Sequence, residues 1–121
     1  MAAYGLAKES DADKLLRSQV IQEVLKEATE VPLACAQACA EAIELSRYAA
    51  KKGSLAVISD AGAAVMSAYG GLKSAALNVY INTGCLKDRA FAEAKLTELN
   101  TIMVNVEELV ADTYDLVKAK L

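Results

Sequence analysis

Residues 55–83 read LAVISDAGAAVMSAYGGLKSAALNVYINT, and this stretch decides the fold class. Apolar side chains recur at helical spacing around almost its whole circumference, and the period-two alternation of a half-buried strand is absent. A helix that is apolar on most sides is typical of the centre of a bundle. We therefore expect residues 55–83 to form the central helix of an all-α protein, buried on most of its sides.

One stripe of this expected central helix is polar or small. Its members recur every three to four residues and comprise Asp60, Ser67, Ser74, Asn78 and Asn82, with Ala63, Ala64 and Gly71 between them. A carboxylate or amide that is buried without a hydrogen-bonding partner destabilises the folded state. Two interpretations stay open: the stripe is a close helix–helix contact whose polar groups bond a neighbouring helix, or it faces a ligand.

The rest of the chain predicts further helices, which gives about four in a multihelical bundle. The first begins at the capping residue Ser10. Pro32 predicts a break or a kink, and the second helix then covers about residues 32–51 and ends before Gly53. Asp88 can cap a last helix with a long apolar stripe.

Length and composition bound the possible functions. The chain has 121 residues, which suits a single helical domain over residues 1–121. It contains no histidine, which excludes Ser-His-Asp and Cys-His nucleophile pairs. The 13 basic and 16 acidic side chains leave a net charge of −3, so nucleic acid is not an expected partner.

The sequence also predicts where the protein works. No stretch approaches the ~18 uninterrupted apolar residues of a membrane span. Residues 1–8 lack the basic start and apolar run of a secretory signal. We therefore expect a cytoplasmic protein with no membrane partner.

Three cysteines, Cys35, Cys39 and Cys85, are an odd number for a disulfide framework. Cys35 and Cys39 are four residues apart, so they share one side of a helix. They can be half of a metal site, a redox pair, or small buried residues in a helix seam. Because a metal site needs more ligands than this pair supplies, we favour the seam and expect no bound metal.

Several short motifs, taken together, resemble one known family. They are EATEVPL at residues 27–33, KGS at 52–54, SDAGAA at 59–64, NVYIN at 78–82 and KD at 87–88. In this order and spacing they resemble the formiminotetrahydrofolate cyclodeaminase and methenyltetrahydrofolate cyclohydrolase family. The similarity extends from about Tyr4 to the end of the chain and corresponds to the C-terminal portion of the family's domain.

The resemblance implies an all-helical protein of folate one-carbon metabolism that forms a homodimer or larger homo-oligomer. It implies a reduced folate, a tetrahydrofolate derivative, as substrate or ligand. In the cyclohydrolase reaction, water opens a methenyl bridge to a formyl group; in the cyclodeaminase reaction, a formimino group cyclises and ammonia leaves. The almost wholly apolar stretch at residues 55–83 independently favours a second chain, since monomers rarely expose large apolar patches.

Within this resemblance, the polar stripe supplies the candidate site. Asp60 is the candidate catalytic residue, because a carboxylate stabilises a cationic amidinium-like centre and can relay protons. The predicted ligand-binding residues are Ser59, Asp60, Asn78, Asn82 and Lys52.

The family's N-terminal segment, which contains a glycine-rich stretch, has no counterpart here, so we expect a truncated form. Three functions stay open: a folate-dependent enzyme, a catalytically inactive module that binds folate or another small ligand, and an oligomeric helical interaction protein.

Overall fold

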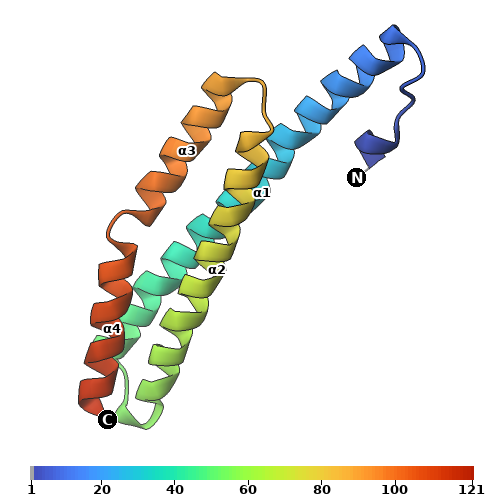
Figure 1. Cartoon of the computed structure of the whole chain (residues 1–121). Coiled ribbons are helices and arrows are strands. Elements are labelled where there is room, and N and C mark those ends of the chain that lie inside the picture. Colours follow the sequence, from blue (N-terminus) through green and yellow to red (C-terminus); the bar gives the residue numbers. More distant parts are fainter. Residues whose placement is uncertain (1) are drawn as a thin grey trace.

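The computed structural model describes residues 2–121, which form a bundle of helices (Figure 1). Its four α-helices are α1 (Asp11–Lys52), α2 (Ile58–Gly84), α3 (Arg89–Met103) and α4 (Val106–Lys120), and two short 3-10 helices are η1 (Ala2–Gly5) and η2 (Leu55–Val57). Residues 2–121 contain no strand. The all-α class and the number of about four helices are therefore confirmed, although two of the helix boundaries differ from the prediction.

The predicted break at Pro32 is wrong, because α1 runs through it as one helix of 42 residues. Ser10 begins α1 with a reciprocal cap: its hydroxyl accepts a hydrogen bond from the Asp13 backbone, and its backbone N–H donates to the Asp13 carboxylate. On both sides of Pro32 the helix is fixed by buried residues, Thr29 before it and Leu33 after it. Packing on both sides outweighs the loss of one helical hydrogen bond.

The α1 and α2 helices form an antiparallel hairpin with a fixed register. Asn82 donates a hydrogen bond to the Ala28 carbonyl at 2.8 Å. A side chain at Gly71 would meet the Cys39 sulfur at 3.0 Å. Ala49 and Ala61 line the same cavity. Between successive contacts, the chain advances by the same number of residues along α1 (28, 39 and 49) as it goes back along α2 (82, 71 and 61). The two helices therefore stay in register over their paired length.

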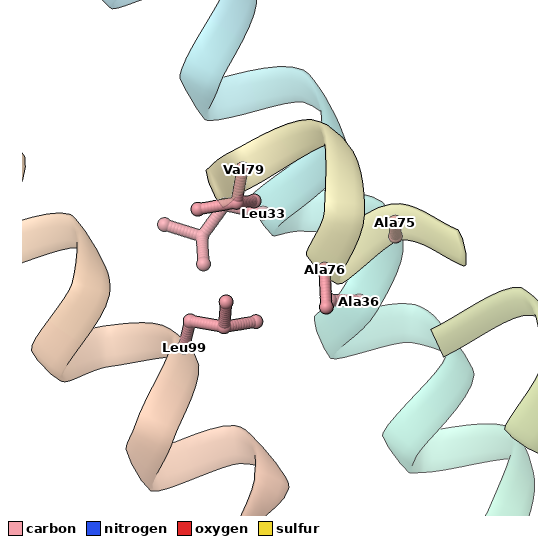
Figure 2. Close-up of a cluster of buried hydrophobic side chains, with 6 residues drawn as sticks. All are labelled: Leu33, Ala36, Ala75, Ala76, Val79 and Leu99. Carbon is pink, nitrogen blue, oxygen red and sulfur yellow. The ribbon is translucent and has the colours of Figure 1, made fainter. Parts of the chain in front are cut away.

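The core follows this hairpin as a line of buried clusters. In the cluster of Figure 2, Leu33 and Ala36 of α1 meet α2 residues, and Leu99 of α3 closes the cluster from the side. A second cluster places Ile43 and Leu72 under α4, and further clusters lie towards each end. Both α3 and α4 pack on α1 and α2, so they extend end to end along the hairpin (Figure 1).

The predicted single last helix is also wrong, because it divides at Val104 and Asn105 into α3 and α4. Asn105 has φ 62° and ψ 6°, the left-handed conformation, which ends one helix and starts the next. Asn tolerates this conformation better than most residues with a side chain. The apolar stripe continues through the division, so the sequence pattern did not reveal it.

A third prediction that fails is the burial of the central helix on most sides. In α2, Leu77 is 68% and Ile81 is 66% exposed. Residues Leu55–Gly84 are long and apolar enough to cross a membrane by length and composition, and 22% of their most apolar window is buried. Core helices of soluble proteins pass the same test, so this finding alone does not indicate a membrane helix.

Candidate functional site

One side of the α1–α2 hairpin carries exposed small and apolar residues, and we call it the open face. Its α1 members recur at helical spacing and are Val24, Val31, Cys35, Ala38, Leu45 and Ala49. Its α2 members are Asp60, Ala64, Ser67, Ser74 and Asn78. All of them are exposed. Most of the polar stripe predicted from the sequence is thus exposed in the single chain, whereas Gly71 and Asn82 are half-buried and contact α1, as the helix-contact interpretation expects.

Asp60 lines a cavity on the open face where α1 ends and α2 begins. The cavity has a volume of about 450 Å³ and is lined by Leu45, Ser46, Ala49, Gly53, Ser54, Val57, Asp60, Ala61 and Ala64. Asp60 lies in the first turn of α2, where the backbone N–H groups of the helix end favour a negative charge. Its carboxylate is therefore the single charged group of a mainly apolar cavity.

Lys52 and Ser59 lie close to Asp60 in sequence but differ in placement. Lys52 is exposed and ends α1, directly before the cavity residues Gly53 and Ser54. Ser59 instead lines a second cavity of about 320 Å³ between α2 and α4, together with Met66, Tyr114 and Lys118 among others. Of the predicted ligand-binding residues, only Lys52 adjoins the cavity of Asp60.

Asn78 and Asn82 lie near the opposite end of α2. At a rise of about 1.5 Å per residue, Asp60 is about 27 Å from Asn78 along the helix axis. Asn78 donates a hydrogen bond to the Ser74 carbonyl at 3.1 Å within its own helix. A single chain therefore does not bring Asp60 together with either asparagine.

Asn82 has a structural role that the sequence did not reveal. Pro32 has no N–H, so the Ala28 carbonyl, four residues earlier, loses its helical donor. The Asn82 side chain supplies the missing hydrogen bond to that carbonyl at 2.8 Å. Only the register of α1 against α2 shows this pairing, because the residues are 54 positions apart.

A group of charged residues holds α3 against α1, away from the open face. The Lys95 ammonium lies 2.8 Å from Glu30 of α1 and 3.3 Å from Glu98. The hydrogen bond with Glu30, which is the largest contribution, raises the pKa of Lys95. Lys26 lies 2.8 Å from Asp88, and both lysines face the Phe91 ring. These contacts form a structural clamp that does not touch the Asp60 cavity.

The lysines at the end of the hairpin also have structural contacts. Lys120 donates hydrogen bonds to the Ala50 carbonyl at 2.6 Å and the Lys51 carbonyl at 3.2 Å. These bonds satisfy carbonyls that the last turn of α1 leaves unpaired and join the end of α4 to it. Lys120 is thus a cap that sequence reasoning missed.

The cysteines show no metal site. Across residues 2–121, no group of three or more His, Cys, Asp or Glu side chains is arranged to hold a metal ion. Cys39 is partly buried against Gly71, and burial first, then the neighbouring Cys35, raises the pKa of its thiol. Cys35 and Cys85 are exposed. The prediction that the two cysteines are small buried residues between helices therefore holds for Cys39 but not for Cys35.

Comparison with known proteins gives a family and two relatives. The family model described as formiminotransferase-cyclodeaminase matches residues 1–101. A methenyltetrahydrofolate cyclohydrolase of Methylorubrum extorquens is 54% identical over all 121 residues, and the chain spans 58% of that protein's length. A formimidoyltransferase-cyclodeaminase of Sus scrofa is 29% identical over 99% of the chain, which covers 22% of that protein.

Proposed function

The chain belongs to the formiminotransferase-cyclodeaminase family, and on this premise we propose that it binds a reduced folate at the Asp60 cavity and opens its methenyl bridge by hydrolysis. The resemblance found in the sequence motifs is thereby confirmed. The methenyltetrahydrofolate cyclohydrolase, 54% identical over the whole chain, supports hydrolysis over the cyclodeaminase reaction. The observation that carries the proposal is the placement of Asp60, a lone carboxylate in a cavity of about 450 Å³.

The chemistry of the methenyl bridge fits this cavity. The bridge is an amidinium-like cation between two nitrogens, so a carboxylate beside it stabilises its charge. Water adds to the bridging carbon and loses a proton, which Asp60 accepts as general base. One carbon–nitrogen bond then breaks as the new hydroxyl group loses its proton and becomes the formyl carbonyl. The released nitrogen takes one proton, and the proton held by Asp60 leaves to water.

The cavity walls suit a flat heterocycle. Leu45, Ala49 and Val57 give an apolar lining, and Ser54 adds a polar residue to it. A volume of about 450 Å³ lies within the range of about 300–1,000 Å³ found for small-molecule sites. Lys52, directly before the cavity residues, is available for an anionic group of the ligand.

We further propose that the working form is a homodimer or larger homo-oligomer. The support is the open face, where Val31 is 69% and Leu45 is 71% exposed without a covering helix. A contiguous apolar surface of this kind marks an interaction site more often than a free surface. A cytoplasmic location stays a prediction of the sequence.

A second candidate is a module that binds folate without turnover. The separation of Asp60 from Asn78 and Asn82 in the single chain favours it, because one chain then lacks amides beside the carboxylate. Measurement of binding and turnover on the same sample separates the two functions.

The test uses Asp60→Asn, with Asp112→Asn as a matched control on the exposed side of α4. Titration calorimetry measures the binding of a methenyl-bridged reduced folate, and loss of the methenyl absorbance measures its hydrolysis. We expect Asp60→Asn to bind this cationic ligand more weakly and, at saturating ligand, to lose about 100-fold or more in the rate of hydrolysis, the size of a general-base contribution. Asp112→Asn should match the parent protein. Binding without hydrolysis by the parent would favour the inactive module, and absence of both would contradict both functions.

A further inference from the structure

A second cavity, between α2 and α4, is not used by the proposed hydrolysis. It has a volume of about 320 Å³ and is lined by Ser59, a residue that the sequence pattern predicted to bind a ligand. The structure places Ser59 here and not in the cavity of Asp60. The volume lies at the lower end of the range of about 300–1,000 Å³ found for small-molecule sites, so a ligand that fits is small.

Close contact between the two helices gives this cavity an apolar base. A Cβ atom at Gly62 of α2 would meet the Val117 side chain of α4 at 3.0 Å, and both residues are buried. Beside this contact, Ala63 contributes only a methyl group, while Met66 and Tyr114 are 45% and 48% exposed. Mainly apolar side chains therefore surround a space that neither helix fills.

Three polar groups line the same cavity without a partner in the chain. They are the hydroxyls of Ser59 and Tyr114 and the ammonium of Lys118. Within residues 2–121, none of these three groups forms a hydrogen bond or an ion pair. Farther along the same two helices the polar groups are paired: Glu107 accepts a hydrogen bond from the Tyr69 hydroxyl at 3.1 Å and lies 3.5 Å from the Lys73 ammonium. The three donors of the cavity are thus free to bind a ligand.

We propose that this cavity binds a small apolar molecule that carries one carboxylate, such as an aromatic monocarboxylic acid. The ring of such a ligand packs on Met66 and Tyr114, because thioether and aromatic side chains make favourable contacts with aromatic rings. Its carboxylate meets the Lys118 ammonium and a neighbouring hydroxyl, both of which donate hydrogen bonds to it. The proposal is independent of the folate reaction, since the two cavities share no lining residue.

Charge along the groove between α2 and α4 selects a single carboxylate. Beyond Met66 and Tyr114 the groove continues into a cavity of about 410 Å³ that is lined by Glu107 and Asp115. Lys118 and Asp115 are about one turn apart on α4 but form no ion pair with each other. The carboxylate of a ligand is therefore favoured at the Lys118 end, and a second carboxylate at its far end would be repelled by Glu107 and Asp115.

Three probes with the same naphthalene ring test the ligand class. Naphthoate carries one carboxylate, naphthalene dicarboxylate carries one at each end, and naphthylmethylamine carries a cation. Titration calorimetry of the unaltered protein should show one saturable site that binds naphthoate about five-fold more tightly than either other probe, the size of one exposed charge pair. On naphthoate binding, the shifts of backbone amide NMR signals should concentrate in residues 59–66 and 114–118.

Substitutions in the cavity separate the role of charge from that of shape. Lys118→Met removes the charge but keeps the length of the side chain, and it should weaken naphthoate binding about five-fold. Lys118→Glu should reverse the preference, so that the amine binds more tightly than naphthoate. Ala63→Leu should weaken the binding of all three probes, because it fills the apolar space. The matched control is Lys14→Met, at an exposed position near the start of α1, which should bind naphthoate like the parent. Circular dichroism checks that each variant is helical.

The proposal is overturned if naphthoate does not bind, if the amine binds the unaltered protein as tightly as naphthoate, or if Lys118→Met and Lys14→Met have equal effects. Competition with the methenyl-bridged folate gives a further test. Naphthoate binding that persists at saturating folate supports a separate site, whereas displacement would make the cavity part of the folate site and contradict the proposal. A protein that binds naphthoate but neither binds nor hydrolyses the folate would contradict the proposed function and leave this site intact.

Discussion

At the scale of single residues, Asn82 and Pro32 act as a pair. The proline removes one hydrogen bond from α1, and the asparagine of α2 restores it at the Ala28 carbonyl, at 2.8 Å. A helix with a proline in its interior remains straight enough to pack when the freed carbonyl finds another donor. The bond also fixes the register of the hairpin, because it links one defined residue of each helix.

This pairing predicts a measurable coupling. Asn82→Ala should lower the free energy of unfolding by about 1–3 kcal/mol, because a partly buried carbonyl loses its donor. In a Pro32→Ala background, the backbone N–H of residue 32 donates to the Ala28 carbonyl. Asn82→Ala should then lower the free energy of unfolding by clearly less. Urea unfolding of all four proteins at one protein concentration measures the coupling. Equal costs in both backgrounds would show that the asparagine does not compensate for the proline.

Asn105 gives a second prediction at this scale. Its φ of 62° lies in the left-handed region that glycine adopts freely and β-branched residues avoid. Asn105→Gly should leave stability nearly unchanged, while Asn105→Val should lower it by about 1–2 kcal/mol. Thermal unfolding of the two variants tests this, and equal stability would mean that the division between α3 and α4 relaxes when Asn105 is replaced.

At the scale of elements, the sequence predicted what depends on neighbouring residues and missed what depends on packing. The caps at Ser10 and Asp88 were recognised because a cap needs only the residues of its own first turn. The continuity of α1 through Pro32 and the division after Met103 were missed, since both are decided by contacts with other helices. Without an alignment of α1 against α2, no local pattern shows where the Ala28 carbonyl finds its donor.

Asp88 links the ends of two elements and predicts an acid dependence. Its carboxylate accepts hydrogen bonds from Lys26 of α1 and from the Phe91 backbone at the start of α3. The Lys26 hydrogen bond, the largest contribution, lowers the pKa of Asp88 below its usual value. A carboxyl group whose pKa is lowered by folding stabilises the fold above its unfolded pKa of about 3.9 and loses that contribution as pH falls through the folded pKa.

Replacement of Asp88 tests this dependence. Asp88→Asn should be less stable than the parent at neutral pH, and the difference should shrink as the pH falls below about 4. Chemical unfolding at pH 7 and at successively lower pH measures it, with Asp112→Asn as an exposed control. If the difference in free energy of unfolding between Asp88→Asn and the parent stays constant with pH, the charge of the Asp88 carboxylate does not stabilise the contact between α1 and α3.

At the scale of the whole molecule, family and fold class were predictable, and the candidate site only in part. Short motifs such as SDAGAA identified the family because their order and spacing are specific. The helical period placed Asp60, Asn78 and Asn82 on one stripe of α2; in the structure Asp60 and Asn78 lie on the open face, and Asn82 is half-buried against α1. The distance between Asp60 and the two asparagines follows from helix geometry alone. Whether other helices bury the stripe depends on where α3 and α4 pack, which the sequence pattern does not show.

The open face leads to the last prediction, which concerns assembly. Leu45 is 71% exposed on the face, and Tyr48 is 67% exposed on another side of the same helix. Leu45→Lys would place a charge on the apolar open face that we propose as the interface between copies, where burial without a partner is unfavourable. We expect Leu45→Lys to remain helical by circular dichroism and to become monomeric, whereas Tyr48→Lys should keep the assembly state of the parent. Light scattering over a range of micromolar concentrations distinguishes the two. If both variants assemble like the parent, the apolar surface of α1 is not what holds the chains together, and another face of the bundle must do so.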